Sequence, residues 1–377
     1  MISCFPGSRR PVAAENIAGP AGYFERALAV AAAACKRPEA TVKRINLGGG
    51  KHGIVHFSDC TLEKLLFPAV GHQELPEPKA EADFKILAWD SVHSGIPMWS
   101  PPWTTGDYLA RGEIAGYNDG RFRAVFQLGS GVFSFYDSHR RIGLWWARDF
   151  VQLPLYEKAA PFLLLFHWFH ALGGDDSVLL HAAAVGTEDR GGVLLAGRGG
   201  SGKSTTALAS LLVSRWRYVA DDYCVVRAAE TSPTVHSLYC SAKIDAKMLG
   251  AFANLCRGAC SFGGRRDPEG KMVLNLHGSL PERLKRELPL RAILLPRIPK
   301  EKNGEASGRR FKPVGSGAAV RALAPSTLFQ LPGAGHNNFR MITALANRLP
   351  CFQFELDSEL SGVSQSLRHF LEQLPSQ

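Results

Sequence analysis

Apolar residues in the second half of the chain come in short runs that are separated by glycine, turn-forming or charged residues. The runs at 178–185, 192–196 and 218–220 are rich in Val, Leu and Ala and are shorter than a typical helix. Short apolar runs bounded by turn signals are typical of buried strands. Further runs at 292–295 and 351–356 have the same character. The pattern therefore predicts a β-sheet in this half of the chain.

A helix is predicted between two of these runs. Residues 204–213 carry apolar side chains at helical spacing and follow a glycine-rich loop. The order strand, loop, helix, strand favours an α/β domain. Residues 223–227 continue the β pattern directly after the run at 218–220, which predicts an antiparallel turn-back. We therefore expect a mixed rather than a wholly parallel sheet.

The first half of the chain has a different pattern. Residues 122–126 and 131–135 predict two short strands joined by a Gly-Ser-Gly turn, which is typical of a hairpin. We expect three segments: a lead-in with an alanine-rich helix at 1–40, a smaller β-rich (α+β) domain at 41–153, and the α/β domain at 154–377. The middle segment carries no catalytic motif, which suits an accessory or peptide-recognition role.

Residues 197–204 match the phosphate-loop pattern G-x-x-x-x-G-K-[ST]. Glycines allow positive φ and turn backbone N–H groups toward phosphate oxygens, and the following helix adds the positive end of its dipole. Lys203 would place a cation on the β and γ phosphates, and the Ser204 hydroxyl would ligate Mg²⁺. We therefore predict ATP and Mg²⁺ as cofactors. The predicted nucleotide-binding residues are Gly197, Arg198, Gly199, Gly200, Ser201, Gly202, Lys203, Ser204 and Thr205.

Two adjacent acids, Asp221 and Asp222, follow the strand predicted at 218–220. Adjacent residues on a strand point to opposite faces. One carboxylate can therefore face the transferred phosphate while the other faces the metal or a structural partner. A carboxylate beside an incoming hydroxyl can orient that hydroxyl for in-line attack. His181 lies in an apolar strand, where a lone histidine is more often a satisfied core residue than a catalytic one.

Three segments together resemble a known family. They are Leu-His-Ala-Ala-Ala-Val at 180–185, Leu-Leu-Ala-Gly-Arg-Gly-Gly-Ser-Gly-Lys-Ser-Thr at 194–205 and Val-Ala-Asp-Asp-Tyr at 219–223. They resemble the HPr kinase/phosphorylase-like proteins, whose phosphate-loop domain is similar to that of phosphoenolpyruvate carboxykinase. The layout looks most like the serine kinases that modify lasso-peptide precursors. The resemblance covers about 181–295 and implies an α/β phosphate-loop core of this type with a mixed sheet.

The resemblance also implies roles for single residues. It makes Asp221 the candidate general base, gives His181 a hydrogen bond to the aspartate or the phosphate, and leaves Asp222 to support the metal. The predicted catalytic residues are Asp221, His181 and Lys203, and the predicted metal ligands are Ser204 and Asp222. The residues expected to neutralise charge on the phosphates or the acceptor are Lys243, Lys271 and Arg265.

One departure from the family bears on the acceptor. The bifunctional HPr kinases carry a glycine-rich signature after the acidic pair, and this sequence lacks it. The departure argues against phosphorylase activity and against HPr as the acceptor. We predict transfer of the ATP γ-phosphate to a serine hydroxyl of a peptide or protein, such as a lasso-peptide precursor. A small-molecule kinase and a phosphate-loop ATPase that acts as a switch or binding module stay open as alternatives.

Composition adds limits on partners and compartment. The chain has 377 residues and a net charge of +10, which attracts polyanions, but it has no nucleic-acid-binding motif. Its eight cysteines are scattered, which predicts reduced thiols in the cytoplasm. The longest apolar run, at 161–172, is far short of the roughly 20 residues that span a bilayer. Whether the protein forms a homo-oligomer is left open by the sequence.

Overall fold

The computed structural model describes residues 19–76, 81–174, 176–228, 232–256, 270–298, 310–333, 335–356 and 359–375. The chain divides into two compact units. Unit 1 consists of residues 1–67, 74–173 and 331–333, and unit 2 consists of the rest. The sequence analysis placed 154–173 with the α/β domain, whereas the packing places this segment in unit 1. Among the described residues, no helix has both the length and the apolar character needed to cross a membrane.

Unit 1 is built on one six-stranded sheet with the strand order β1-β2-β3-β6-β5-β4. The strands are β1 (Thr41–Gly48), β2 (Lys51–Phe57), β3 (Phe84–Asp90), β4 (Phe122–Gln127), β5 (Val132–Asp137) and β6 (Ile142–Ala147). The pairs β2–β3 and β3–β6 are parallel, and the other pairs are antiparallel. The hairpin predicted from the sequence is β4–β5.

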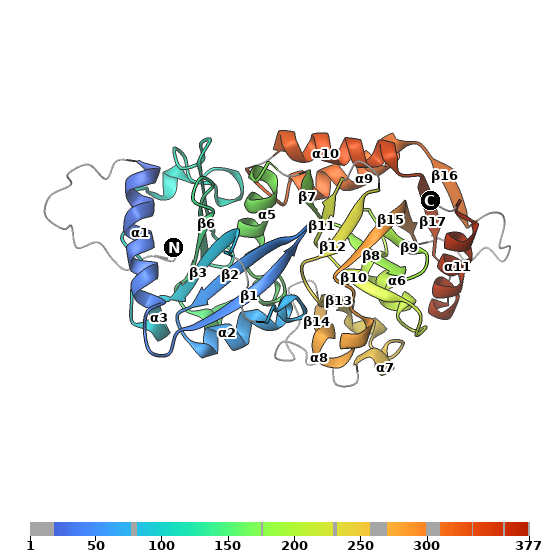
Figure 1. Ribbon diagram of the computed structural model, residues 1–377, viewed down its shortest axis with the longest axis horizontal. Helices are drawn as coiled ribbons and strands as arrows, with labels where there is room; N and C mark the ends of the chain where they lie inside the picture. Colours follow the sequence, from blue (N-terminus) through green and yellow to red (C-terminus); the bar gives the residue numbers. More distant parts are fainter. Residues whose placement is uncertain are drawn as a thin grey trace, which may run out of the picture. The chain divides into compact units, whose positions relative to one another are not determined.

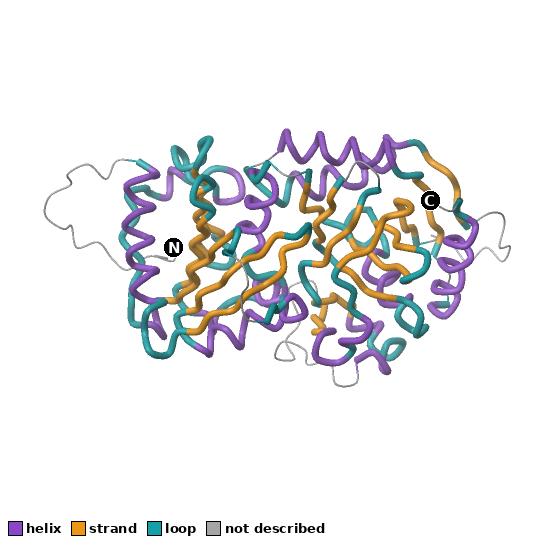
Figure 2. Tube along the Cα trace, viewed as in Figure 1, coloured by secondary structure: helices purple, strands orange, loops and turns teal. Residues whose placement is uncertain are grey.

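Helices cover both faces of this sheet (Figure 2). Helix α1 (Pro20–Ala34) covers one face, where Phe24 packs against Phe135 with ring centroids 4.9 Å apart. Helix α5 (Leu163–Leu172) covers the other face, where Phe169 stacks on Phe84 at 4.8 Å. Every residue of β5 is buried, because side chains on both faces of this strand meet a helix. The apolar run at 161–172 is therefore part of the core of unit 1.

Three short helices lie at the ends of the strands and loops of unit 1. They are α2 (Cys60–Leu66), α3 (Ser91–Ser94) and α4 (Leu155–Ala159). Asp59 and Asp90 begin α2 and α3 by accepting hydrogen bonds from backbone N–H groups of the first turn. Asp59 lies two residues after the end of β2, and Asp90 is the last residue of β3, so that each helix begins close to the end of a strand.

Unit 2 contains a bent, mixed sheet with the order β10-β8-β9-β15-β12-β11-β7, extended from β15 by β17 and β16 (Figure 1). The strands are β7 (Ser177–Leu180), β8 (Ala183–Thr187), β9 (Gly191–Leu195), β10 (Arg217–Ala220), β11 (Cys224–Arg227), β12 (Thr234–Ser237), β15 (Glu287–Arg297), β16 (Phe311–Val314) and β17 (Cys351–Glu355). The pairs β15–β9 and β15–β17 are parallel, and the other pairs between these strands are antiparallel. The predicted mixed sheet is confirmed.

Two details of the predicted strands are wrong. The single strand expected at 178–185 is interrupted at His181 and Ala182, and its halves β7 and β8 pair with different partners. The turn-back expected after Asp222 does not pair β10 with β11. Instead, β10 pairs with β8, and β11 pairs with β7 and β12. In both places the chain leaves one part of the sheet for another, and an apolar pattern carries no signal of such a bend.

Helices also cover both faces of the sheet in unit 2. Helices α9 (Ser316–Leu328) and α10 (Gly335–Arg348) pack on a core that includes Leu180 and Leu194. Helices α6 (Lys203–Ser210) and α11 (Leu360–Gln373) pack on a second core that includes Leu195. Neighbouring residues of β9 thus belong to opposite cores. Helices α7 (Ala253–Cys256) and α8 (Leu276–Ser279) are short.

A two-stranded ribbon completes unit 2. Strands β13 (Ser241–Asp245) and β14 (Lys271–Asn275) pair antiparallel and form a sheet of their own. Residues 68–73 also pack in unit 2, beside the start of this ribbon. The Cys240 N–H donates a hydrogen bond of 2.9 Å to the Ala69 carbonyl oxygen, and the Leu276 N–H donates one of 3.0 Å to that of Cys240.

Candidate active site

The bends in two strands bring the predicted histidine and acids together. His181 lies in the break between β7 and β8, and Asp221 and Asp222 lie in the break between β10 and β11. The second break is a tight turn, in which the Tyr223 N–H donates a 2.9 Å hydrogen bond to the Asp221 carbonyl oxygen. Asp222, at its centre, has a φ of 65°, a strained value for a non-glycine residue. Strain of this kind is concentrated at functional sites.

The phosphate loop connects β9 to α6, as its motif predicts. Gly197, Gly200 and Gly202 have positive φ values of 155°, 76° and 102°. A Cβ at Gly202 would collide with the Leu356 side chain, so that this position accepts no larger residue without rearrangement. Helix α6 begins at Lys203 with Gly202 as its N-cap residue. The backbone N–H groups of its first turn lack helical partners and are suited to an anion.

Lys203 is buried beneath this loop, with an exposed fraction of 6%. Its ammonium donates hydrogen bonds to the carbonyl oxygens of Gly197 at 2.7 Å and Arg198 at 3.3 Å. Burial lowers the pKa of Lys203, while the charges of Asp221 and Asp222 act against this shift. A buried ammonium that has only neutral carbonyl partners is suited to a phosphate, which would supply the missing negative charge.

Asp221 lies beside the hydroxyl predicted to ligate the metal. The Ser204 Oγ donates a hydrogen bond of 2.8 Å to Asp221 Oδ1, and the Lys243 N–H donates one of 3.1 Å to Oδ2. The Asp221 residue is only 2% exposed. Burial, together with the charge of Asp222, raises the pKa of Asp221 above its ordinary value. Each oxygen of the Asp221 carboxylate thus has a partner: Ser204 at the start of α6 and Lys243 on strand β13.

Asp222 faces a different set of partners. His181 Nε2 lies 3.5 Å from Asp222 Oδ1, and the Lys243 ammonium forms an ion pair with Oδ2. The Asp222 side chain keeps an exposed fraction of 22%. Burial acts to raise its pKa, but the hydrogen bond from His181 and the charge of Lys243 outweigh burial and lower that pKa. Asp222 is therefore ionised at neutral pH and partly open to solvent.

Two further residues, Thr327 and Tyr223, contact His181. Its backbone N–H donates a 3.2 Å hydrogen bond to the Thr327 Oγ1 of α9, and the Tyr223 ring lies 5.3 Å from the imidazole centroid. The Tyr223 hydroxyl in turn donates a 2.9 Å hydrogen bond to Gln330. The Nδ1 of His181 is buried without a hydrogen-bond partner among the described residues. Thr327 and Gln330 escaped the sequence analysis, because no local motif marks a contact across 146 residues.

The β13–β14 ribbon carries two of the predicted charge-neutralising residues. Lys243 is paired with Val273, and Lys271 is paired with Asp245, so that both lysines lie on one face of the ribbon. Both lysines act electrostatically to lower the pKa of Lys203. The structure therefore brings Lys243 and Lys271 to the phosphate-loop side, whereas Arg265 lies outside the described residues. Arg198 of the loop is exposed.

Comparison with known proteins adds little to this geometry. No protein-family model and no curated protein sequence matches the chain. Among solved structures, the chain is similar to the Hpr(Ser) kinase/phosphatase from Coxiella burnetii, with 11% sequence identity and a TM-score of 0.30. The match covers 52% of this chain and 97% of the other. A likeness this distant carries no argument about function.

Proposed function

We propose that this protein is an ATP-dependent phosphotransferase that moves the γ-phosphate to a serine hydroxyl of a peptide or protein. One observation carries the proposal: the hydrogen bond of 2.8 Å between Ser204, at the end of the phosphate loop, and Asp221. It joins a loop shaped for phosphates to a pair of carboxylates, with His181 next to the second of them. Phosphoryl transfer depends mainly on positioning and charge stabilisation, and these groups supply both.

The chain's own residues fit a magnesium nucleotide. Lys203 has a buried ammonium with neutral partners, and the Ser201 Oγ is buried without a hydrogen-bond partner among the described residues. Ser204 and Asp221 present a hydroxyl and a carboxylate, the oxygen ligands that Mg²⁺ prefers. When bound, the ion would neutralise negative charge that develops on the phosphates. Lys243 and Lys271 would add positive charge on the same side.

The hydrogen bonds favour an exchange of the roles that the resemblance implied for the two acids. Asp221 is nearly inaccessible and both its oxygens have partners, so we assign it to the metal side with Ser204. Asp222 is ionised and partly exposed, so we assign it to the acceptor. An ionised carboxylate can accept a hydrogen bond from the acceptor hydroxyl and orient it, and a loose transition state does not require a strong base.

His181 supports this assignment of Asp222. Its Nε2 lies 3.5 Å from the carboxylate, and its backbone is held by Thr327. An imidazole that donates to Asp222 keeps that carboxylate ionised and fixed in direction. We therefore propose His181 as the residue that positions Asp222. The serine of a peptide or protein as acceptor rests on the resemblance seen in the sequence.

The experiment that tests the function is incubation of the full chain with γ-labelled ATP and Mg²⁺. Separate reactions contain a peptide and protein pool, a metabolite pool, or no acceptor. We expect label on seryl residues of a peptide or protein. Label on metabolites alone would identify a small-molecule kinase. Label only in free phosphate, whichever acceptor is present, would identify an ATPase and contradict the proposal.

A further inference from the structure

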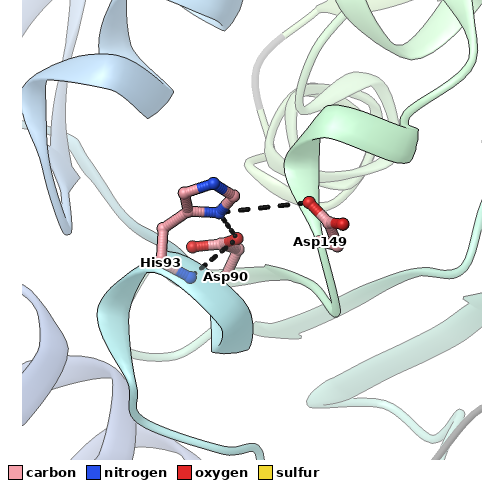
Figure 3. A group of neighbouring side chains, drawn as sticks. All are labelled: Asp90, His93 and Asp149. Carbon is pink, nitrogen blue, oxygen red and sulfur yellow. Dashed lines mark hydrogen bonds and ion pairs between the residues drawn. The ribbon is translucent and has the colours of Figure 1, made fainter.

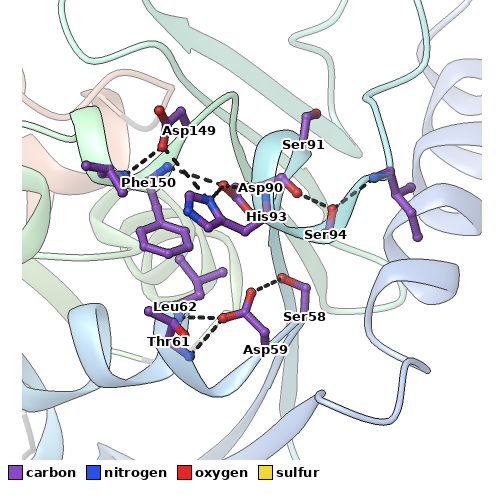
Figure 4. A network of polar contacts seen from close by, with 12 residues as sticks. Ser58, Asp59, Thr61, Leu62, Asp90, Ser91, His93, Ser94, Asp149 and Phe150 are labelled. Carbon is purple, nitrogen blue, oxygen red and sulfur yellow. Dashed lines mark hydrogen bonds and ion pairs between the residues drawn. The ribbon is translucent and has the colours of Figure 1, made fainter.

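A second group of polar side chains lies in unit 1, away from any motif found in the sequence. Strands β2, β3 and β6 run parallel, and each is followed by an aspartate near its carboxyl end: Asp59, Asp90 and Asp149. In α/β sheets, ligands bind preferentially outside the carboxyl ends of parallel strands. Figure 4 shows these three aspartates together with His93, which lies one turn after Asp90 in α3.

Two of the aspartates approach one nitrogen of His93. The distance from His93 Nδ1 to Asp90 Oδ2 is 2.7 Å, and that to Asp149 Oδ1 is 4.0 Å. One ligand atom from each of the three residues lies within 4.8 Å of the other two. Figure 3 shows the two carboxylates approaching this nitrogen from different sides. An ion about 2.1 Å from each atom, the usual length of a bond from Zn²⁺ to nitrogen or oxygen, fits between atoms at this spacing.

Asp90 supplies an independent indication of a cation site. It is fully buried, and its Oδ1 has no hydrogen-bond partner among the described residues. Its Oδ2 accepts from His93 and, at 3.4 Å, from the Phe150 N–H. Buried carboxylates are nearly always paired with a cation or bound to a metal. Asp90 thus contacts His93 through Oδ2, and the other oxygen of the same buried carboxylate is left without a partner among the described residues.

Within the described part of the chain, no lysine or arginine forms an ion pair with Asp90 or Asp149. Arg37 donates to the carbonyl oxygens of His93 and Ser94, and no hydrogen bond from it to either carboxylate is seen among the described residues. Among the described residues, the Asp149 carboxylate accepts a hydrogen bond from the Val151 N–H besides its contact with His93. The two carboxylates therefore share a single imidazole as their side-chain partner among the described residues.

We propose that Asp90, His93 and Asp149 form a binding site for a divalent transition-metal ion. The Phe150 ring stacks on the imidazole with centroids 4.0 Å apart, which fixes the direction of Nδ1. One nitrogen and two carboxylate ligands favour Mn²⁺, Fe²⁺, Co²⁺ or Zn²⁺ over Ca²⁺ and Mg²⁺, which prefer oxygen alone. The side chains of His93 and Asp149 are 37% and 26% exposed, so that the ion is reached from solvent and keeps positions for water or an external ligand.

The test measures uptake of Mn²⁺ and Co²⁺ by the full, metal-stripped chain without nucleotide. A background with both Ser204→Ala and Asp221→Asn removes the two ligands proposed for the phosphate-loop site. Free Mn²⁺ is measured by electron paramagnetic resonance, and bound Co²⁺ by its visible absorption. We expect one equivalent of at least one ion per chain. His93→Ala and Asp149→Asn should each weaken the affinity by about tenfold or more, since loss of even an outer partner of a metal ligand costs this much.

His336→Ala provides the matched control, because this histidine is exposed on α10 of unit 2 and belongs to no such group. Circular dichroism shows whether each variant is folded. If His93→Ala does not fold, Asp149→Asn is the decisive variant. Uptake of neither ion overturns the proposal. Uptake that persists unchanged in both folded variants overturns it as well, since the ion would then lie elsewhere.

Discussion

The Ser204 hydroxyl donates a 2.8 Å hydrogen bond to Asp221 Oδ1, which joins the first turn of α6 to the end of β10. This contact links two segments that the sequence separates by 17 positions. Asp222 instead faces His181 and Lys243. The two adjacent carboxylates thus have different partners, and the roles proposed for them rest on this difference.

Lys203→Met should weaken the binding of Mg²⁺-ATP by about 10- to 100-fold, since hydrogen bonds to charged groups contribute roughly 1.5–3 kcal/mol. The Lys203 ammonium is buried, and its hydrogen-bond partners among the described residues are the carbonyl oxygens of Gly197 and Arg198. Its loss should not lower the melting temperature of the free protein, because burial disfavours the charge. Isothermal titration calorimetry measures the affinity. The exposed Lys247→Met serves as control, and an equal loss there would refute a specific role for Lys203.

Thr327→Val should reduce phosphoryl transfer several-fold while the affinity for Mg²⁺-ATP stays unchanged. The variant keeps the shape of the side chain but removes the acceptor of the His181 N–H hydrogen bond. Without this partner the imidazole that positions Asp222 gains freedom. Thr327→Ser restores the hydroxyl and should restore the rate. A Thr327→Ser rate as low as that of Thr327→Val would show that packing, and not the hydrogen bond, matters at this position.

Glu157 should make unit 1 less stable as pH rises. Burial raises the pKa of Glu157 from 4.5 to about 7, and its Oε1 has no hydrogen-bond partner among the described residues. The folded state thus binds this proton more tightly than the unfolded state. The resulting stabilisation is complete below pH 4.5 and is lost as pH rises through 7, by about 3 kcal/mol.

The Glu157→Gln variant isolates this effect, because the amide cannot ionise. Urea unfolding at pH 5 and pH 8 should show a larger loss of stability for the wild-type protein than for Glu157→Gln. Parallel losses in the two proteins would mean that the carboxyl group does not titrate in this range.

Gly143→Ala should destabilise unit 1 by about 1–3 kcal/mol, the usual effect of overpacking a core. A Cβ at this position of β6 would lie 3.0 Å from Leu165 Cδ1 and 3.2 Å from Phe84 Cζ. Gly120→Ala is the matched control, since a Cβ there meets nothing within 4 Å. Urea unfolding compares the two. Equal stabilities would contradict the close packing of α5 on the sheet.

The part of the candidate site that can be predicted from the sequence is its one contiguous motif, residues 197–204. The phosphate loop is one uninterrupted pattern, and its strand and helix follow from apolar spacing alone. His181 was harder, because a histidine inside an apolar run gives no sign that the strand breaks there. The roles of the two acids depend on the positive φ of Asp222, and that value depends on where β11 finds its partners.

The contacts that the sequence does not indicate are long-range packing contacts. The helix Leu163–Leu172 has the apolar pattern of a buried helix, but nothing in it indicates that it covers the sheet of unit 1. Thr327 reaches His181 from α9, and Asp149 reaches His93 from the end of a different strand. Such contacts are fixed by the order of strands in a sheet, which single-sequence patterns do not encode.

The most direct test of the proposed chemistry compares Asp222→Asn with Asp221→Asn in γ-phosphate transfer and in Mg²⁺-ATP binding. Asp222→Asn should bind Mg²⁺-ATP like the wild-type protein but transfer phosphate at least about 100-fold more slowly, the usual contribution of a group that handles the acceptor proton. Asp221→Asn should lose affinity for Mg²⁺-ATP. Wild-type transfer by Asp222→Asn would contradict the account.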